Sequence, residues 1–470
     1  MTDTVMTTAA EPDGAPRLAG LDILRGIAIL GILFMNINAM GGATMMGWFD
    51  IWRYGHSAAD EAAFFLRNVF ADGTARCLLE MLFGVGMMIL TTRAADGVGQ
   101  AVDAGRARRV LRWMFGPWAV MRGYYWRNFV LFLFGLVHVF IVLWMGDILH
   151  TYGIAAMIAF LFRRTGPKTM LAIGLSMALF VAGAGGYGYW SATTEIRQET
   201  AIKARQAAGA PITADEKKLL AKADKGHTER AKQRAEFGQR MTSEDRTRGD
   251  SGTFATWAKS IWDVFFWIQA MGIEVQSIWE AAATMLVGGA LFQWGIIQGR
   301  RSSRFYATLL MIGYAIGIAF RLPATLNDIA EYKGPQFFWF ANEFARLAMT
   351  LGHVSLIHLL LRSAAGARLL RPFEAVGRTA LTVYILQSII CLWILYPPFA
   401  LGLYATQGWA GWMLTALAIN VVLTFWANWY VQHYRIAPVE WAWRSIIAGK
   451  VLPIRKAGGS LAGGSVPIAA

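Results

Sequence analysis

The stretch that decides the fold is RLAGLDILRGIAILGILFMN, residues 17–36, an apolar run of membrane-spanning length with three polar side chains in one pattern. At about 100° per residue, Asp22, Arg25 and Asn36 fall within roughly 60° of one another and form one stripe on a helix. A charge at bilayer depth costs about 2.5 kcal/mol or more, so such a stripe normally faces the interior of a helix bundle. The stretch therefore predicts a polytopic membrane protein with a candidate site beside its first helix.

Simpler structural explanations stay open for the same three residues. Asp22 and Arg25 are three residues apart near one end of the span, so they can pair with each other while Arg25 extends to the interface. Asn36 lies deep in the span, where a hydrogen bond to another helix would account for it.

The composition points to the same class of protein. Of 470 residues, 56% are hydrophobic, and the chain has 20 Trp and 28 Phe, which is too apolar for soluble domains. The two cysteines, Cys77 and Cys391, lie in apolar segments, so we expect no disulfide framework and no metal site. The sequence contains no Walker loop and no HExxH motif, and nothing in it indicates nucleic-acid binding.

Ten segments are predicted as membrane spans of an all-α helix bundle. They are residues 20–40, 74–92, 128–146, 148–163, 168–190, 278–298, 304–321, 336–361, 374–396 and 409–431. Residues 254–271 are apolar but contain Lys259, Asp263 and Gln269, so we predict an interfacial or re-entrant helix there.

The distribution of positive charge predicts the orientation of these spans. The formal net charge is +14, and seven arginines lie between Arg93 and Arg127 directly after the second span. By the positive-inside rule this connection is cytoplasmic, and with ten spans both termini are cytoplasmic as well. We therefore expect a multi-pass protein of the bacterial inner membrane whose basic loops contact anionic membrane lipids.

Five parts of the chain follow from this interpretation. They are a disordered cytoplasmic N-terminus at 1–19, a first five-helix half at 20–190, an external soluble insertion at 191–253, a second half at 254–434 and a cytoplasmic tail at 435–470. Residues Thr213 to Glu216 match the capping-box pattern. Polar residues occupy every face of the helices predicted in the insertion. We predict a solvated helical hairpin that serves as a spacer, with partner docking or substrate gating as the alternative.

Several motifs resemble those of the YeiB-like membrane proteins, a family of unknown function. They are LDILRGIA at 21–28, GLVH at 135–138, WMGDILHTY at 144–152 and GRTALTVYILQS at 377–388. Two positions depart from the family pattern, because Thr74 and Glu80 stand where the family usually has Lys and Ser. The first motif is also similar to the opening helix of the heparan-alpha-glucosaminide N-acetyltransferases and of other integral-membrane acyltransferases. The resemblance does not cover the insertion.

His138 is the strongest catalytic candidate. It lies inside a predicted span, about eight residues before an external turn that holds Asp147, so the two are expected at different depths. Histidine titrates near neutrality and is suited to accept or relay a proton, although a lone buried histidine is more often structural. We add Asp147 and Asn36 to His138 as the predicted catalytic set.

Basic residues near the cytoplasmic side are candidates for binding the phosphates of acyl-CoA. Arg378 is predicted at a helix N-terminus, where backbone amides and a guanidinium together favour an anion. The predicted set is Arg25, Arg378, Asp22, Arg109 and Arg112.

A third group of polar residues is predicted to line the interior of the bundle. In the eighth span Asn342, Arg346 and His353 share a stripe, with Glu343 within reach of Arg346. A polar network that only holds helices together is an equally good explanation. The full predicted lining is Glu80, Asn342, Arg346, His353, Tyr384, Gln387 and Ser388.

The resemblance to membrane acyltransferases implies an enzyme that moves an acyl group from acyl-CoA to a glycan or lipid-linked acceptor near the external face. His138 would act as general base or transient acyl carrier. No permanently bound cofactor is expected, and a homo-oligomer stays open. The alternative is a transporter or channel for a small polar or anionic solute, followed by a non-catalytic scaffold.

Overall fold

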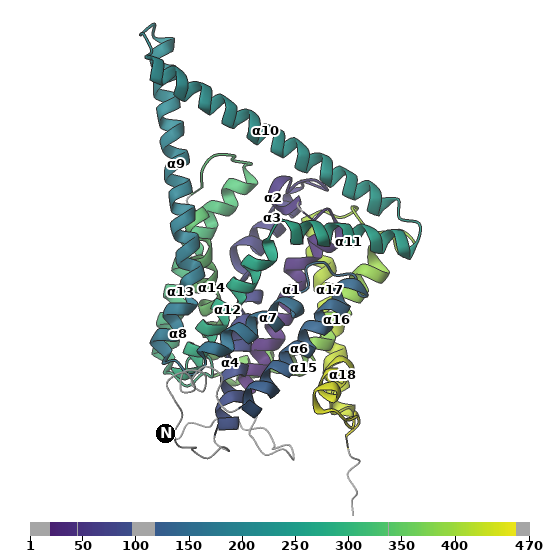
Figure 1. Cartoon of the computed structure of the whole chain (residues 1–470). Helices are drawn as coiled ribbons and strands as arrows, with labels where there is room; N and C mark the ends of the chain where they lie inside the picture. Colours follow the sequence, from purple (N-terminus) through teal and green to yellow (C-terminus); the bar gives the residue numbers. More distant parts are fainter. Residues whose placement is uncertain (1–18, 45, 96–117, 337, 457–470) are drawn as a thin grey trace, which may run out of the picture.

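The computed structural model describes residues 19–44, 46–95, 118–336 and 338–456. Within these ranges the chain forms helices and no β-strand, as predicted (Figure 1). The helices are α1 (Ala19–Gly41), α2 (Met46–Phe49), α3 (Ala58–Leu66), η1 (Arg67–Ala71), α4 (Thr74–Ala95), α6 (Trp118–Phe140), α7 (Leu149–Ala159), η2 (Phe160–Phe162), α8 (Pro167–Gly174), α9 (Ser176–Ala207), α10 (Ala214–Gly249), α11 (Phe254–Ala270), α12 (Ile273–Gln293), α13 (Ser303–Ile329), α14 (Phe338–Leu360), α15 (Ala364–Arg378), α16 (Ala380–Ile389), η3 (Ile390–Leu395), α17 (Trp409–His433) and α18 (Pro438–Ala448).

The protein is a membrane helix bundle. Six spans among the described helices are long and apolar enough to cross a membrane, or seven if the bent pair α14–α15 is one span. The remaining predicted spans coincide with α6 and with two shorter apolar helices, Leu149–Phe162 and Ala380–Leu395. The number of ten spans therefore stays a prediction.

Helix α1 packs against α15, α4 and α17. The crossing of α1 and α15 depends on glycine, because a Cβ on Gly377 would lie 1.8 Å from the backbone oxygen of Asp22. A Cβ on Gly26 would likewise lie 2.0 Å from the backbone oxygen of Phe373. The glycines of the first and last motifs thus bring two backbones into contact.

The span predicted at 374–396 is broken in two. Helix α15 ends at Arg378 and α16 begins at Ala380, and the chain bends by 118° between α14 and α15. Thr379, between α15 and α16, donates its hydroxyl to the backbone oxygen of Ala375 at 3.1 Å. Helix α15 is therefore a separate helix, and most of it lies between the predicted spans 336–361 and 374–396.

The insertion forms an open helical hairpin that projects from the bundle. Figure 1 shows α9 and α10 meeting at a tip far from the other helices, from which α10 returns to α11. The predicted capping box is present, with Thr213 accepting from the amide of Glu216 and the Glu216 side chain accepting in return. The hairpin geometry follows from this cap and from the break between Ala207 and Ala214.

The returning end of α10 is anchored to the bundle rather than solvated. Glu244 accepts from the Thr44 hydroxyl at 2.7 Å and pairs with Arg248 at 2.9 Å. Asp245 pairs with Arg53 at 2.7 Å and also accepts from the Tyr54 hydroxyl. Burying a charge costs free energy unless it is paired with an opposite charge. These paired contacts therefore fix this end of α10 over the segment that follows α1.

Helix α11 lies across the end of the bundle, transverse to the long helices (Figure 1). Its Phe265 ring contacts Phe140 of α6 edge-on, with centroids 5.5 Å apart. On its outer face Lys259 and Asp263 form an exposed ion pair at 2.8 Å. This placement fits the predicted interfacial helix, and it covers the turn between α6 and α7.

The two ends of the bundle carry different elements. The start of α1, the end of α4, α15 and α18 lie at one end, whereas α2, α3, α10 and α11 lie at the other (Figure 1). We call these the α18 end and the α11 end. The turn that contains Asp147 belongs to the α11 end, since α11 packs on it.

Candidate functional site

His138 and Asp147 form a fully buried hydrogen-bonded pair. His138 Nδ1 lies 2.6 Å from Asp147 Oδ1, and neither side chain has any exposed surface. His138 lies in the last turn of α6, and Asp147 lies in the connection to α7. The prediction that these two side chains lie at different depths is therefore wrong.

The reason is that α6 ends at Phe140, six residues before the predicted end of the span at 146. The chain then folds back, because the amide of Trp144 donates to the backbone oxygen of His138 at 3.1 Å. Leu143 has a φ of 70°, a strained conformation for a residue with a branched side chain. This tight turn returns Asp147 to the level of His138.

Gly135 makes room for the turn. A Cβ at this position would lie 2.2 Å from the backbone nitrogen of His150 and 2.6 Å from Asp147 Oδ2. Any side chain there would push the turn away from α6. The glycine of the GLVH motif is therefore part of the construction that brings Asp147 to His138.

A second histidine and a second carboxylate extend the pair. Asp147 Oδ2 accepts from the amide of His150 at 2.9 Å and lies 2.9 Å from His150 Nδ1. His150 Nε2 is 3.2 Å from Glu274 Oε1 at the start of α12. Glu274 also accepts from the Thr151 hydroxyl at 2.7 Å. His138, Asp147, His150 and Glu274, which we call the histidine cluster, thus connect α6, α7 and α12.

The hydrogen bonds determine which nitrogen of His138 is free. A carboxylate can only accept, so Nδ1 carries the proton that is donated to Asp147. Nε2 then presents a lone pair, and it is buried without a hydrogen-bond partner among the described residues. The Tyr384 ring packs edge-on against the imidazole with centroids 4.8 Å apart, and its hydroxyl lies 3.4 Å from Asp147 Oδ1.

This arrangement is suited to accepting a proton. A buried carboxylate on Nδ1 orients the imidazole and stabilises the cation that forms when Nε2 is protonated. With both carboxylates ionised and His150 protonated between them, the histidine cluster carries one negative charge. A proton on His138 Nε2 neutralises that charge, which makes the site a candidate general base.

A second buried group of charges surrounds Arg346 of α14. Its guanidinium lies 3.1 Å from Glu80 of α4, 3.1 Å from Glu280 of α12 and 2.8 Å from Glu343 of α14. All four side chains are buried. The pairing of Arg346 with Glu343 occurs as the sequence suggested, and Glu80 joins the same network.

Further contacts complete the network on α4 and α7. Arg76 pairs with Glu280 and lies 3.6 Å from Glu80. The Tyr152 hydroxyl lies 3.4 Å from Glu80 Oε1. Every carboxylate in the network thus has a basic partner, which is the arrangement that buried charges require. The five charged residues Arg76, Glu80, Glu280, Glu343 and Arg346 are named the arginine–glutamate network below.

The other predicted lining residues lie at different places. Asn342 is exposed, although it lies one turn before the buried Arg346 on α14. His353 Nε2 donates to the backbone oxygen of Phe70 at 2.8 Å, and its Nδ1 lies 2.9 Å from the Tyr314 hydroxyl. Gln387 donates to Asn420 at 2.9 Å. Ser388 has no exposed surface and lies 3.4 Å from the backbone oxygen of Tyr384.

Asn36 and the predicted phosphate-binding residues are also separated from the histidine cluster. Asn36 is half-buried on α1, and in the described part of the chain it makes no hydrogen bond to His138 or Asp147. Asp22 and Arg25 pair with each other at 2.7 Å, and 38% of the Arg25 side chain is exposed. Arg109 and Arg112 lie outside the described residues.

The helix N-terminus beside Arg378 is already occupied. The first amides of α16 donate to the Glu440 carboxylate of α18, that of Leu381 at 2.7 Å and that of Thr382 at 3.2 Å. Burial raises the pKa of the Glu440 carboxyl. The prediction that these amides serve an external anion is therefore wrong, because an internal carboxylate caps them.

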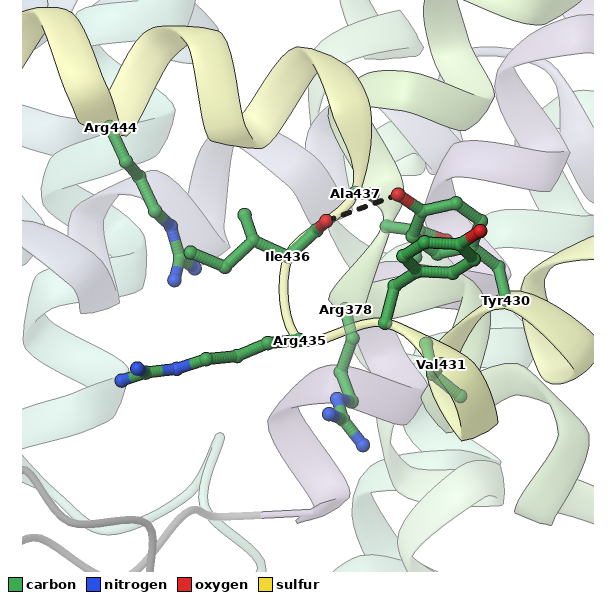
Figure 2. Close-up of a pocket in the computed structure, with 9 residues that line it drawn as sticks. Arg378, Tyr430, Val431, Arg435, Ile436, Ala437 and Arg444 are labelled. Carbon is green, nitrogen blue, oxygen red and sulfur yellow. Dashed lines mark hydrogen bonds between the residues drawn. The ribbon is translucent and has the colours of Figure 1, made fainter. Parts of the chain in front are cut away.

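Arg378 instead lines a pocket at the α18 end. The pocket lies between α15, α17 and α18 (Figure 2). Among the described residues, its lining contains three arginines, Arg378, Arg435 and Arg444, and no carboxylate. The remaining lining residues are Thr379, Tyr430, Val431, Tyr434, Ile436 and Ala437. We call this the arginine pocket.

Sequence reasoning missed three residues that the structure places in these contacts. Glu280 is an ionisable residue inside an apolar span, and this signal could have identified it. Glu274 lies at the start of that span and has no such signal. Glu440 sits in a tryptophan-rich tail that reads as an interfacial helix, so nothing local predicts its contact with α16.

Comparison with known proteins places the chain among uncharacterized relatives. Residues 291–450 match the family model described as Protein of unknown function (DUF418). The chain is 26% identical over 446 residues to the uncharacterized protein YxaH of Bacillus subtilis, covering 94% of this chain and 96% of that protein. It is 25% identical over 431 residues to the uncharacterized protein YeiB of Escherichia coli, covering 91% and 95%. These comparisons confirm the resemblance to YeiB-like membrane proteins of unknown function that the sequence motifs predicted.

Proposed function

We propose that this protein is a membrane-embedded acyltransferase that moves an acyl group from acyl-CoA to a hydroxyl of a glycan or lipid-linked acceptor. The observation that carries the proposal is the buried His138–Asp147 pair with an unpartnered Nε2. An oriented imidazole with a free lone pair can act as the general base that activates a hydroxyl. The similarity of the opening helix to membrane acetyltransferases supports the same reaction class.

His138 acts on the acceptor in the proposed reaction. Nε2 takes the hydroxyl proton while the acceptor oxygen attacks the thioester carbonyl carbon, and a tetrahedral intermediate forms. When the intermediate collapses, the carbon–sulfur bond breaks, and the thiolate of coenzyme A takes the proton from Nε2. Asp147 holds the Nδ1 proton throughout and stabilises the transient imidazolium. In the second route Nε2 itself attacks the carbonyl, and His138 carries the acyl group.

The donor and the base lie at opposite ends of the bundle in this proposal. Arg127 of α6 packs over the Trp443 ring of α18 at 4.0 Å, beside the arginine pocket. His138 follows eleven residues later in α6, which is about 16 Å along the helix axis. A donor anchored by its phosphates needs a long flexible arm to bring its acyl end to His138, and the pantetheine arm of coenzyme A has that form.

The candidate site is closed to solvent in this structure. His138 and Asp147 have no exposed surface, so an acceptor reaches Nε2 only when a neighbouring group moves. Helix α11 covers the turn through Phe265, whose ring lies 6.3 Å from that of His150. We place the acceptor entrance at the α11 end, on the proposed external face.

Binding and transfer by the unmodified protein test the function directly. The purified full-length chain in lipid nanodiscs is titrated with acetyl-CoA and longer acyl-CoAs by calorimetry, and release of free coenzyme A thiol is followed with membrane glycolipids as acceptors. We expect saturable acyl-CoA binding and acceptor-dependent thiol release. The absence of acyl-CoA binding up to about millimolar concentrations, equivalent to about −4 kcal/mol, overturns the proposal.

A transporter for a small polar or anionic solute is the second candidate. The observation in its favour is the arginine–glutamate network, which places charges on α4, α12 and α14 inside the bundle. Ionisable residues at such depth often mark solute pathways. A transporter predicts no acyl-CoA binding, and a solute flux that changes when His138 is replaced.

The orientation belongs to the same proposal, with the α18 end in the cytoplasm and the insertion outside a bacterial inner membrane. Arg230→Cys on α10 should react with an impermeant thiol reagent in intact spheroplasts, whereas Asp103→Cys should react only after permeabilisation. The native Cys77 and Cys391 are fully buried, so they give little background. Labelling of the cysteine at 103 alone in intact spheroplasts contradicts the proposed orientation.

A further inference from the structure

We propose that the arginine pocket binds a phosphate group. Three arginines line it from three separate segments: Arg378 ends α15, Arg435 follows α17, and Arg444 belongs to α18. Figure 2 shows Arg435 and Arg444 extending to the side of the Arg435–Ala437 segment away from Tyr430, and Arg378 pointing downward nearer to Val431. A guanidinium presents a rigid fork of donors that matches phosphate oxygens, so a group of three favours a multiply charged oxyanion.

The charges around the pocket reinforce the preference for an anion. Arg127 of α6 brings a further guanidinium close by, since it packs at 4.0 Å over the ring of Trp443, the residue before Arg444. Two carboxylates at this end of the bundle have other partners, because Glu440 accepts from the amides at the start of α16 and Asp22 pairs with Arg25. Within the described residues, no carboxylate side chain lines the pocket, and the surrounding field is positive.

Stabilisation of helix ends explains only part of this arrangement. Arg378 is the last residue of α15 and Arg435 follows α17, where cations favour the negative end of a helix dipole. Arg444 lies inside α18, six residues after its first residue Pro438 and four before its end at Ala448. Its presence in the same pocket is not explained by the ends of α15 and α17.

The phosphate has two chemical sources, a soluble nucleotide-like donor and the headgroup of an anionic phospholipid. The choice of coenzyme A rests on the proposed function, in which this end of the bundle faces the cytoplasm. Under that proposal the arginine pocket anchors the phosphates of acyl-CoA, and the acyl end extends along α6 toward His138. An anionic headgroup would occupy the same guanidinium groups without any link to His138.

Matched glutamine variants test the pocket. The full chain is placed in nanodiscs of phosphatidylcholine, which carries no net charge, and is titrated with coenzyme A and separately with a short-chain phosphatidylglycerol. Arg378→Gln and Arg444→Gln should each weaken coenzyme A binding by about tenfold or more, since each removes charge-assisted hydrogen bonds. The control is Arg371→Gln, which removes an exposed arginine from the same helix, α15, and should leave binding unchanged.

The outcomes separate the pocket from the function. Arginine-dependent binding of phosphatidylglycerol with no binding of coenzyme A keeps the phosphate site and overturns the acyltransferase. Coenzyme A binding that is equal in all variants overturns the phosphate site and keeps the acyltransferase. Lower melting temperatures of Arg378→Gln and Arg444→Gln with unchanged binding assign these arginines to helix stabilisation and also overturn the site. The absence of binding by either probe overturns both.

Discussion

His138→Ala is expected to lower acyl transfer by about 10²- to 10⁴-fold, the contribution that a positioned general base makes to a reaction. Acyl-CoA affinity should stay nearly unchanged, because the imidazole acts in the chemical steps and the phosphates bind at the other end of the bundle. The measurement is the rate of thiol release at saturating donor and acceptor, together with calorimetric titration of the same variant. A fall in the rate without a fall in affinity is the signature of a transition-state role.

A buried histidine elsewhere in the bundle gives the matched control. His358 of α14 is also buried, and its Nε2 lies 3.1 Å from the backbone oxygen of Ile297. His358→Ala should keep the transfer rate even if it lowers the melting temperature. Asp147→Asn should reduce transfer as well, since Nδ1 loses its carboxylate acceptor. Wild-type rates in His138→Ala would remove this residue from the chemistry.

The sequence predicted the class of fold but not the turn on which the candidate site depends. Apolar length alone identifies α1, α12 and α17, because membrane spans must satisfy their backbone within a helix. The same criterion extended α6 through Val142 and Trp144, which are as apolar as the helix itself. The early end of α6 follows from packing of the turn on Gly135, a contact that no local pattern encodes. The pairing of His138 with Asp147 therefore could not be predicted from the sequence.

Apart from Arg346 and Glu343, the charged residues inside the bundle were predicted without their partners, because those partners lie on other helices. Glu80 was predicted as a lining residue, and its basic partner Arg346 lies 266 residues later. Helical periodicity places Asn342 and Arg346 on one stripe, yet Arg346 is buried and Asn342 is exposed. Periodicity gives the direction of a side chain on its own helix, and the packing of α4 and α12 decides which part of that face is covered.

Arg346→Met is expected to destabilise the protein by about 3 to 5 kcal/mol, the cost of breaking a buried ion pair by removing one partner. Methionine keeps much of the volume of the side chain, so the loss is mainly electrostatic. Glu280 retains Arg76 in this variant, but Glu343 makes hydrogen bonds to no other side chain among the described residues. Reversible denaturation in mixed micelles measures the change in unfolding free energy.

A double variant shows whether the unpaired carboxylate is the cause. Arg346→Met combined with Glu343→Gln replaces the stranded charge with a neutral amide, so it should recover part of the lost stability. Arg371→Met, at an exposed position on α15, is the control and should change stability by less than about 0.5 kcal/mol. Wild-type stability of Arg346→Met would show that these charges do not hold α4, α12 and α14 together, and would favour the pathway that a transporter needs. A loss that the double variant reverses identifies the arginine–glutamate network as the polar element that fixes the packing of these three helices.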